Sequence, residues 1–195
     1  MNYSKLKKLS GRLYFSSRDA AAAMGIKHAS ALVLCNRYVK QGLFVRIKKD
    51  FYVLDQSWDS YSRDDFFRIS NFLQVPSYIS LLTALAYYGI STQVQRNYFE
   101  SVCLKRSVLY EPEGASFNYY KINGRYYFGF EKSGGIFIAS KEKAFIDAVY
   151  LYSFGKYKID FSALDLASLD KTKIVKMSKI YPLKTRKILE KLCRN

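Results

Sequence analysis

Cysteine and histidine are scarce in this sequence. Its 195 residues include three cysteines and a single histidine. Cys35, Cys103 and Cys193 are far apart and odd in number, which fits reduced thiols in a cytoplasm better than a disulfide framework. His28 has neither a second histidine nor a close pair of cysteines with which to share an ion, so we expect no metal site.

Long hydrophobic runs are also missing. No run approaches the roughly 20 apolar residues that a transmembrane helix needs, and the opening MNYSKLKKLSG has no apolar segment of the signal-peptide kind. We therefore expect a cytoplasmic protein with no membrane partner. Hydrophobic residues nevertheless make up 49% of the chain, with 18 tyrosines and 14 phenylalanines. This is enough to build a core for one domain or two small ones.

The chain also lacks the residue patterns of common catalytic sites. Its candidate carboxylates are Asp64, Asp65, Glu111, Glu113, Glu142 and Asp147. The first four begin a predicted helix or lie in a turn, where they suit the helix dipole or solvent. Glu142 and Asp147 are five residues apart and do not share a helix face. Asp147 has apolar neighbours and is expected to accept hydrogen bonds or to pair with an arginine in the core. Without a nucleophile–base pair or a glycine-rich phosphate loop, we expect neither an enzyme nor a cofactor.

Acidic residues are half as frequent as basic ones, and the imbalance is segregated. Lysine and arginine number 32 against 16 aspartates and glutamates. The net charge is +9 in residues 1–54, zero in 55–150 and +7 in 151–195. Basic ends around a neutral middle indicate two surfaces that face polyanions. The last segment also comes near the pattern of an amphipathic membrane-surface helix, which is the alternative for that end.

The first basic segment has the pattern of a winged helix-turn-helix, predicted for residues 1–56. A short basic helix at about residues 2–10 and a brief strand, RLYFS, precede a helix that Ser16 or Ser17 caps and Gly25 ends. A second helix covers residues 29–42. The stretch GLFVRIKKDFYVL then predicts a hairpin over residues 44–54, with its tip at Lys48-Lys49-Asp50.

In a winged helix the second helix enters the major groove, and the hairpin lies along the phosphate backbone or the minor groove. The residues that we expect to bind DNA are Ser17, Arg18, Lys27, His28, Ser30, Asn36, Arg37, Arg46, Lys48 and Lys49. Their side chains contact phosphates or base edges in such complexes. Two alternatives stay open: a basic hairpin tip that is only solvated, and a winged helix that binds a protein.

The remainder, residues 57–195, predicts a mixed helix–sheet domain and hence an α+β protein. SRDDFFRISNFLQVP is typical of a helix that ends at Pro76, and SYISLLTALAYYGIS (77–91) of a buried helix. Strand-like runs follow at 97–106, 116–124, 125–131 and 135–140. Asn123-Gly124 between two of them is a strong hairpin signal. SKEKAFIDAVYLYS then predicts a helix.

A basic helix pair is predicted at the C-terminal end. Asp170 is the expected cap, and Pro182 separates the two helices. The expected apolar stripes are Ile174, Val175, Met177 and Ile180 in the first helix, and Leu183, Ile188, Leu189 and Leu192 in the second. The basic outer surface would consist of Lys173, Lys176, Lys184, Arg186, Lys187 and Lys191. It is either a solvated face or a second polyanion surface that binds RNA or flanking DNA.

Three stretches, in this order, resemble the AbiEi-type antitoxins of bacterial abortive-infection systems. They are GLFVRIKKDFYVL, PSYISLLTALAYYGI, which is similar to the family's Tyr-Ile-Ser…Ala-Leu…Tyr-Gly helix, and ASKEKAFIDAVYL, which is similar to its Glu-Lys-Ala…Asp helix. The likeness covers roughly residues 10–155. The family often has a glycine at the hairpin tip, where this chain has Lys49-Asp50.

The resemblance implies an antitoxin of a phage-defence system that represses its own two-gene operon. Its N-terminal domain would bind double-stranded operator DNA, and its C-terminal domain would carry the antitoxin activity. The partner gene would encode a nucleotidyltransferase-like toxin, which the antitoxin counteracts without forming a stable complex.

Overall fold

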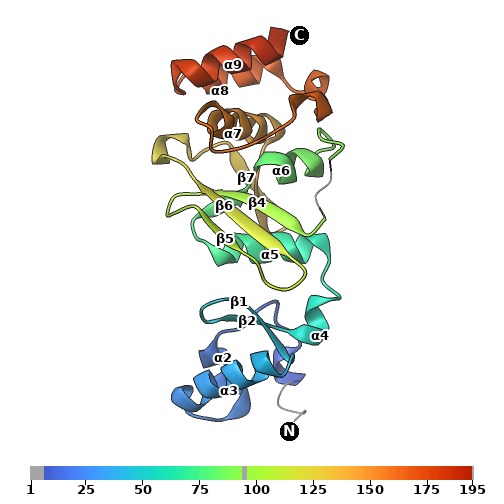
Figure 1. The fold of residues 1–195 in the computed structure, drawn as a ribbon, viewed down its shortest axis with the longest axis vertical. Coiled ribbons are helices and arrows are strands. Elements are labelled where there is room, and N and C mark those ends of the chain that lie inside the picture. The colour runs from blue at the N-terminus through green and yellow to red at the C-terminus, as the bar shows by residue number, and fades with distance from the viewer. Residues whose placement is uncertain (1–6, 94–95, 195) are drawn as a thin grey trace. The chain divides into compact units, whose positions relative to one another are not determined.

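The computed structural model describes residues 7–93 and 96–194, which form a mixed α+β structure of two compact units (Figure 1). The first unit comprises residues 1–69 and 110–116, and the second comprises 70–109 and 117–195. The boundary predicted after residue 56 therefore falls inside the first unit. Of the predicted helix at 2–10, the structure has a 3-10 turn, η1 (Lys7–Leu9), and residues 1–6 lie outside the described part.

The first unit begins with two helices and a hairpin, as the sequence predicts. Ser16 caps α2 (Ser17–Met24) through a capping box with Asp19, and Gly25 ends it in the left-handed conformation. Helix α3 (His28–Lys40) follows, and then strands β1 (Phe44–Lys48) and β2 (Phe51–Leu54) pair antiparallel. The predicted strand RLYFS is reduced to a single bridge between Phe15 and Tyr52.

The core of this unit joins both helices to the hairpin. Phe15, Cys35, Phe44 and Tyr52 are all buried in one apolar cluster. The ring of Phe44 meets those of Phe15 and Tyr38 edge-on, at centroid distances of 4.8 and 5.2 Å. Such contacts fix the helices against the hairpin, because closely packed rings leave few alternative arrangements.

Two further helices and a loop complete the first unit. Helix α4 (Asp55–Trp58) precedes α5 (Arg63–Leu73), which belongs to this unit as far as Ile69. The indole N–H of Trp58 donates to the carbonyl oxygen of Glu113 at 2.8 Å, which holds the 110–116 segment in the unit. Glu113 therefore lies in a structural turn, as expected.

The second unit contains a six-stranded sheet with the order β5-β6-β4-β3-β8-β7. The strands are β3 (Ser77–Ile79), β4 (Tyr98–Cys103), β5 (Val108–Tyr110), β6 (Ser116–Lys121), β7 (Phe130–Ser133) and β8 (Ile136–Ala139). Strand β3 is central, antiparallel to β4 and parallel to β8. Strand β5 was not predicted from the sequence.

The predicted helix over residues 77–91 is wrong at its start. Residues Ser77–Ile79 form β3, and the helix α6 covers only Leu81–Tyr87. Tyr78 and Ile79 are buried on opposite faces of the sheet. A strand that is buried on both faces has the same unbroken apolar pattern as a buried helix, so periodicity does not separate the two.

The hairpin predicted at Asn123-Gly124 does not form. The Asn123 side chain caps a 3-10 turn, η2 (Gly124–Tyr126), and β6 and β7 are not neighbours in the sheet. Tyr126 is buried and stacks on Tyr181 at 4.4 Å. Burial of this ring overrides the local turn signal. The hairpin of this region joins β7 to β8 instead, through Gly134 and Gly135, which both have positive φ.

Three helices of the second unit pack around a central one. Ser140 caps α7 (Lys141–Ser153), which packs against α6, α8 (Lys171–Ser178) and α9 (Leu183–Arg194). Short 3-10 turns, η3 (Phe161–Ala163) and η4 (Leu166–Ser168), link α7 to α8. Asp170 caps α8, as predicted. The predicted apolar stripes are partly wrong, because Val175, Ile180 and Leu183 are exposed. No helix that the structure describes is both long and apolar enough to cross a membrane.

Candidate nucleic-acid interface

Three side chains tie together the elements that the sequence assigned to DNA recognition. The backbone N–H of Ser17, at the start of α2, donates to Asp50 Oδ1 at 2.7 Å. The Ser17 hydroxyl lies 2.8 Å from Nε2 of His28, the first residue of α3. Asp50 sits at the hairpin tip between β1 and β2. The starts of both helices and the tip of the hairpin are therefore held in one place.

Asp50 has an unusual backbone conformation for a residue other than glycine, with φ of 57°. Aspartate tolerates this left-handed conformation better than most residues, because its short side chain bonds to nearby backbone. Partial loss of hydration acts to raise the pKa of the exposed Asp50, but the hydrogen bonds from Ser17 and the nearby His28 and Arg18 outweigh it. The pKa of Asp50 therefore lies below its usual range, and the carboxylate is ionised at neutral pH.

The predicted recognition residues of α3 and its N-cap are exposed. Lys27, His28, Ser30, Asn36 and Arg37 are all exposed, and the Arg37 guanidinium lies 5.5 Å from the Tyr38 ring centre. Two apolar side chains share this face, Leu32 with 41% and Val33 with 69% of its surface exposed. The helical spacing of Ala31, Leu32, Cys35, Tyr38 and Val39 predicts a stripe that faces the core, and this prediction is wrong for Leu32. The exposed face of α3 is thus polar and basic with an apolar centre.

Ser17 differs from the other candidates on α2 and α3. It is fully buried, and both its hydroxyl and its N–H have partners. We therefore assign Ser17 to positioning His28 and Asp50, not to direct contact with a ligand. Its neighbour Arg18 is exposed, as a direct contact requires.

The hairpin exposes basic side chains next to this cluster. Arg46 and Lys49 are exposed, and Lys48 is half-buried with its ammonium group 5.5 Å from the Phe51 ring centre. The pairing register shifts between Arg46 and Lys48. Such a bulge increases the local twist of a hairpin and re-aims its side chains.

The predicted second basic surface, on α8 and α9, is smaller than expected. Lys176, Lys184, Lys187 and Lys191 are exposed. Lys173 instead forms an ion pair with Glu142 at 2.9 Å, and Arg186 is half-buried with a buried Nε. The ammonium group of Lys184 lies 5.7 Å from the Phe154 ring centre. Five lysines of this surface are therefore exposed, and one of them, Lys173, is paired with Glu142.

The carboxylate predicted to lie in the core, Asp147, belongs to a buried network. Its carboxylate accepts hydrogen bonds from Tyr78 and Ser80, both at 2.9 Å, and pairs with Lys143 on the same helix. Lys143 also donates to the Tyr181 hydroxyl at 3.0 Å. The partner is thus a lysine and not an arginine. Burial acts to raise the pKa of Asp147 and to lower that of Lys143, while each charge opposes the shift of the other.

Comparison with known proteins supports the fold and gives no information about function. No family model matches the chain, and no curated protein matches it. The crystal structure of the RV2827C protein from Mycobacterium tuberculosis is similar, with a TM-score of 0.65 and 10% sequence identity, over 98% of this chain and 75% of that one. At this identity the likeness concerns the fold alone. It supports the arrangement of helices and sheet described above.

Sequence reasoning missed the role of Asp50. The residue lies 33 positions from Ser17, so their hydrogen bond has no local sequence signal. The available hint was the tip Lys49-Asp50 itself, since a tight hairpin turn needs a residue that accepts positive φ. Within the described part of the chain, no cluster of three His, Cys, Asp or Glu side chains could hold a metal ion.

Proposed function

We propose that the chain is a DNA-binding antitoxin that represses its own toxin–antitoxin operon and counteracts a nucleotidyltransferase-like toxin. In this proposal the first 56 residues act as a winged helix. Helix α3 enters the major groove, and the β1–β2 hairpin serves as the wing.

The observation that carries the DNA-binding part is the Ser17–His28–Asp50 cluster. It fastens the hairpin tip to the starts of α2 and α3. Around it lie exposed cations from three elements, among them Arg18, Lys27 and Lys49. A duplex needs phosphate contacts from several elements at once to fix the register of a recognition helix. Val33, at the centre of the α3 face, suits the methyl group of thymine.

The antitoxin part rests on the three stretches that resemble the AbiEi-type family. It predicts that a neighbouring gene encodes a nucleotidyltransferase-like toxin, and co-expression of the chain with that gene's product is its test. We expect the full chain to restore growth. A toxin that still arrests growth in the presence of the full chain would contradict this part, without bearing on DNA binding.

Fluorescence anisotropy with labelled duplexes tests the DNA-binding part. We expect the DNA upstream of the chain's own gene to bind more tightly than a random duplex of the same length. Lys27→Ala with His28→Ala should weaken this preference by about 1–3 kcal/mol for each lost base contact. Lys132→Ala, on β7 of the second unit, is the matched control and should change nothing. Equal binding of both duplexes by the unmodified chain would overturn the proposal.

A second candidate function is a winged helix that binds a protein. The exposed Leu32 and Val33 on α3 favour it, because apolar side chains are common at the centre of protein interfaces. Leu32→Ser with Val33→Ser distinguishes the two functions. Loss of a protein partner with unchanged DNA affinity would favour this candidate, whereas the DNA-binding proposal expects a change in affinity for the upstream duplex.

A further inference from the structure

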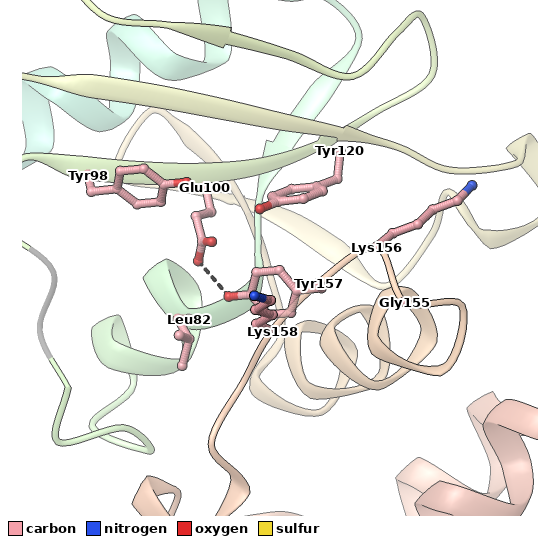
Figure 2. A pocket seen from close by; sticks show the side chains of 8 residues that line it. All are labelled: Leu82, Tyr98, Glu100, Tyr120, Gly155, Lys156, Tyr157 and Lys158. Atoms are coloured by element: carbon pink, nitrogen blue, oxygen red, sulfur yellow. Dashed lines mark hydrogen bonds between the residues drawn. The ribbon is translucent and has the colours of Figure 1, made fainter.

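The second unit contains a hollow that none of the features above uses. Its volume is about 350 Å³, within the range of small-molecule sites. It lies where β4, β6, the start of α6 and the segment after α7 meet (Figure 2). The side chains that matter for its chemistry are Tyr98, Glu100, Tyr120, Lys156, Tyr157 and Lys158.

A carboxylate forms the inner end of the hollow. Glu100 is only 2% exposed, and it accepts hydrogen bonds from the Tyr157 hydroxyl at 2.9 Å and from the backbone N–H groups of Leu82 and Thr83. An ionised carboxylate accepts about four hydrogen bonds, so Glu100 can accept a further donor. Glu100 forms no ion pair with any residue in the described ranges 7–93 and 96–194. Burial without a cation raises the pKa of Glu100 to about 7.

Aromatic side chains form the walls. Tyr98 and Tyr120 are half-buried, and their hydroxyl groups point towards Glu100 (Figure 2). Asn118 holds both rings in place, because its amide donates to the Tyr98 hydroxyl at 2.7 Å and to the Tyr120 hydroxyl at 2.9 Å. The Tyr120 ring also packs edge-on against Tyr157, with centroids 5.4 Å apart. Such fixed rings offer faces on which a flat ligand stacks at little entropic cost.

The outer rim is basic. Lys156 and Lys158 are exposed, and the Lys156 ammonium group points away from Glu100 (Figure 2). The segment reaches this place through Gly155, whose φ of 68° turns the chain after α7. A ligand in the hollow therefore meets an acceptor at the inner end, aromatic faces at the sides and positive charge outside.

These three features together select among ligand classes. A small ammonium ion suits the carboxylate and the rings, but the two lysines repel it. A nucleotide suits all three, since an exocyclic amine donates, a base stacks and a phosphate accepts. We propose that the hollow binds a nucleotide whose base carries an exocyclic amine, with the amine on Glu100, the base on Tyr120 and the phosphate on Lys156 and Lys158. The site is independent of the proposed DNA surface.

Isothermal titration of the full chain with CMP and UMP tests the base contact. The two ligands differ in size very little, but cytosine donates from its amine where uracil has an acceptor. We expect CMP to bind at least about ten times more tightly than UMP, because a buried acceptor is left unpaired by uracil. Equal affinities, or no binding of CMP and of the oligonucleotide rC6, would overturn the proposal.

Two variants sharpen the result. Glu100→Gln replaces the acceptor by a group that also donates, so the preference for CMP should shrink or reverse while circular dichroism stays unchanged. If this variant does not fold, Lys156→Ala with Lys158→Ala decides the case, because both residues are exposed. The double variant should weaken the binding of CMP at least about fivefold and leave the binding of cytidine, which has no phosphate, unchanged. Lys132→Ala is the control, and equal loss for CMP and cytidine would overturn the phosphate contact.

The same chemistry has two sources, a free nucleotide and a single-stranded RNA. If rC6 binds more than about ten times as tightly as CMP, and Tyr120→Leu removes the difference, the ligand is a single strand. If CMP binds as tightly as rC6, the ligand is a free nucleotide. Both results support the site and identify its source.

Discussion

The two units each hold a network of polar side chains around an aspartate, and the two networks differ in exposure. In the first unit, Asp50 is exposed and binds the backbone of Ser17. In the second, Asp147 is fully buried and binds Lys143, Tyr78 and Ser80. The exposed network joins elements that face solvent and leaves their cations available to a ligand. The buried one fixes the packing of α7 and leaves nothing for a ligand to contact. Of the two networks, the one around Asp50 therefore leaves side chains that a ligand can reach.

The largest loss of stability should come from breaking the buried network around Asp147. Asp147→Ala leaves the Lys143 ammonium group buried without its counter-charge, which costs about 3–5 kcal/mol. Urea denaturation followed by circular dichroism measures this loss. Arg68→Ala is the matched control, because it breaks an exposed pair with Asp65 and should cost less than about 1 kcal/mol. Similar losses in both variants would remove the distinction between buried and exposed pairs.

A second prediction concerns pH and the buried Glu100. Its pKa is raised to about 7 in the folded chain from the ordinary 4.5, so the folded state holds a proton that the unfolded state has released between these values. The stability from this group is complete below pH 4.5 and is lost as pH rises through 7, by about 3 kcal/mol in all. Thermal melts from pH 5 to 8 should show this decline, and Glu100→Gln should flatten it. If stability declines equally with pH in the variant, other titrating groups cause the decline.

A methyl group added at Gly129 should disturb the packing around Lys143. Gly129 has φ of 71°, and a Cβ there would lie 3.1 Å from Lys143 Cγ and 2.8 Å from Met177 Cε. Gly129→Ala should therefore cost about 1–3 kcal/mol, from backbone strain and overlap together. Gly134→Ala is the control: its φ is 56°, nothing lies within 4 Å of the added atom, and backbone strain alone should cost about 1 kcal/mol. Equal costs in urea denaturation would show that the contact with Lys143 is unimportant.

Breaking the exposed network should affect binding more than stability. Asp50→Ala removes the acceptor for the Ser17 N–H and should cost about 1 kcal/mol of stability. It should also reduce the preference for the upstream duplex over random DNA, because the hairpin tip loses its attachment to α2. Asp50→Asn keeps an acceptor and the tolerance for positive φ, so that preference should survive. Anisotropy titrations measure this preference. If both variants lose it equally, the charge of Asp50 matters and its hydrogen bond to Ser17 does not.

The smallest effect on stability is expected at the hairpin tip. Lys48→Ala with Lys49→Ala should change the free energy of unfolding by less than about 0.5 kcal/mol, as is usual for surface residues. The slope of log K against log salt for any duplex should shrink by roughly two units, since phosphate contacts release counterions whatever the sequence. An unchanged slope would leave the two lysines with a role in solubility only.

Local signals in the sequence determined much of the first unit and the helices. Gly25 and Asp170 mark helix ends in the structure as they do in the sequence, and Ser16 is the cap of the two serines that the sequence offers, because capping bonds span only a few residues. The segregation of charge likewise needs no structure to be seen. The predicted DNA contacts on α3 are exposed, and whether they touch DNA stays a prediction.

Tertiary structure alone decided the features that depend on distant partners. Strand β3 forms because β4 and β8 pair with it. Tyr126 stacks on Tyr181 and does not take part in the hairpin that the sequence predicts. The Ser17–Asp50 bond and the hollow at Glu100 join segments that lie far apart in the chain. A propensity acts over a few neighbouring residues and is worth at most about 1 kcal/mol each, whereas burial of a large side chain contributes about 1.5–3 kcal/mol. Where the two disagree, burial decides, and the sequence alone does not reveal which residues will be buried together.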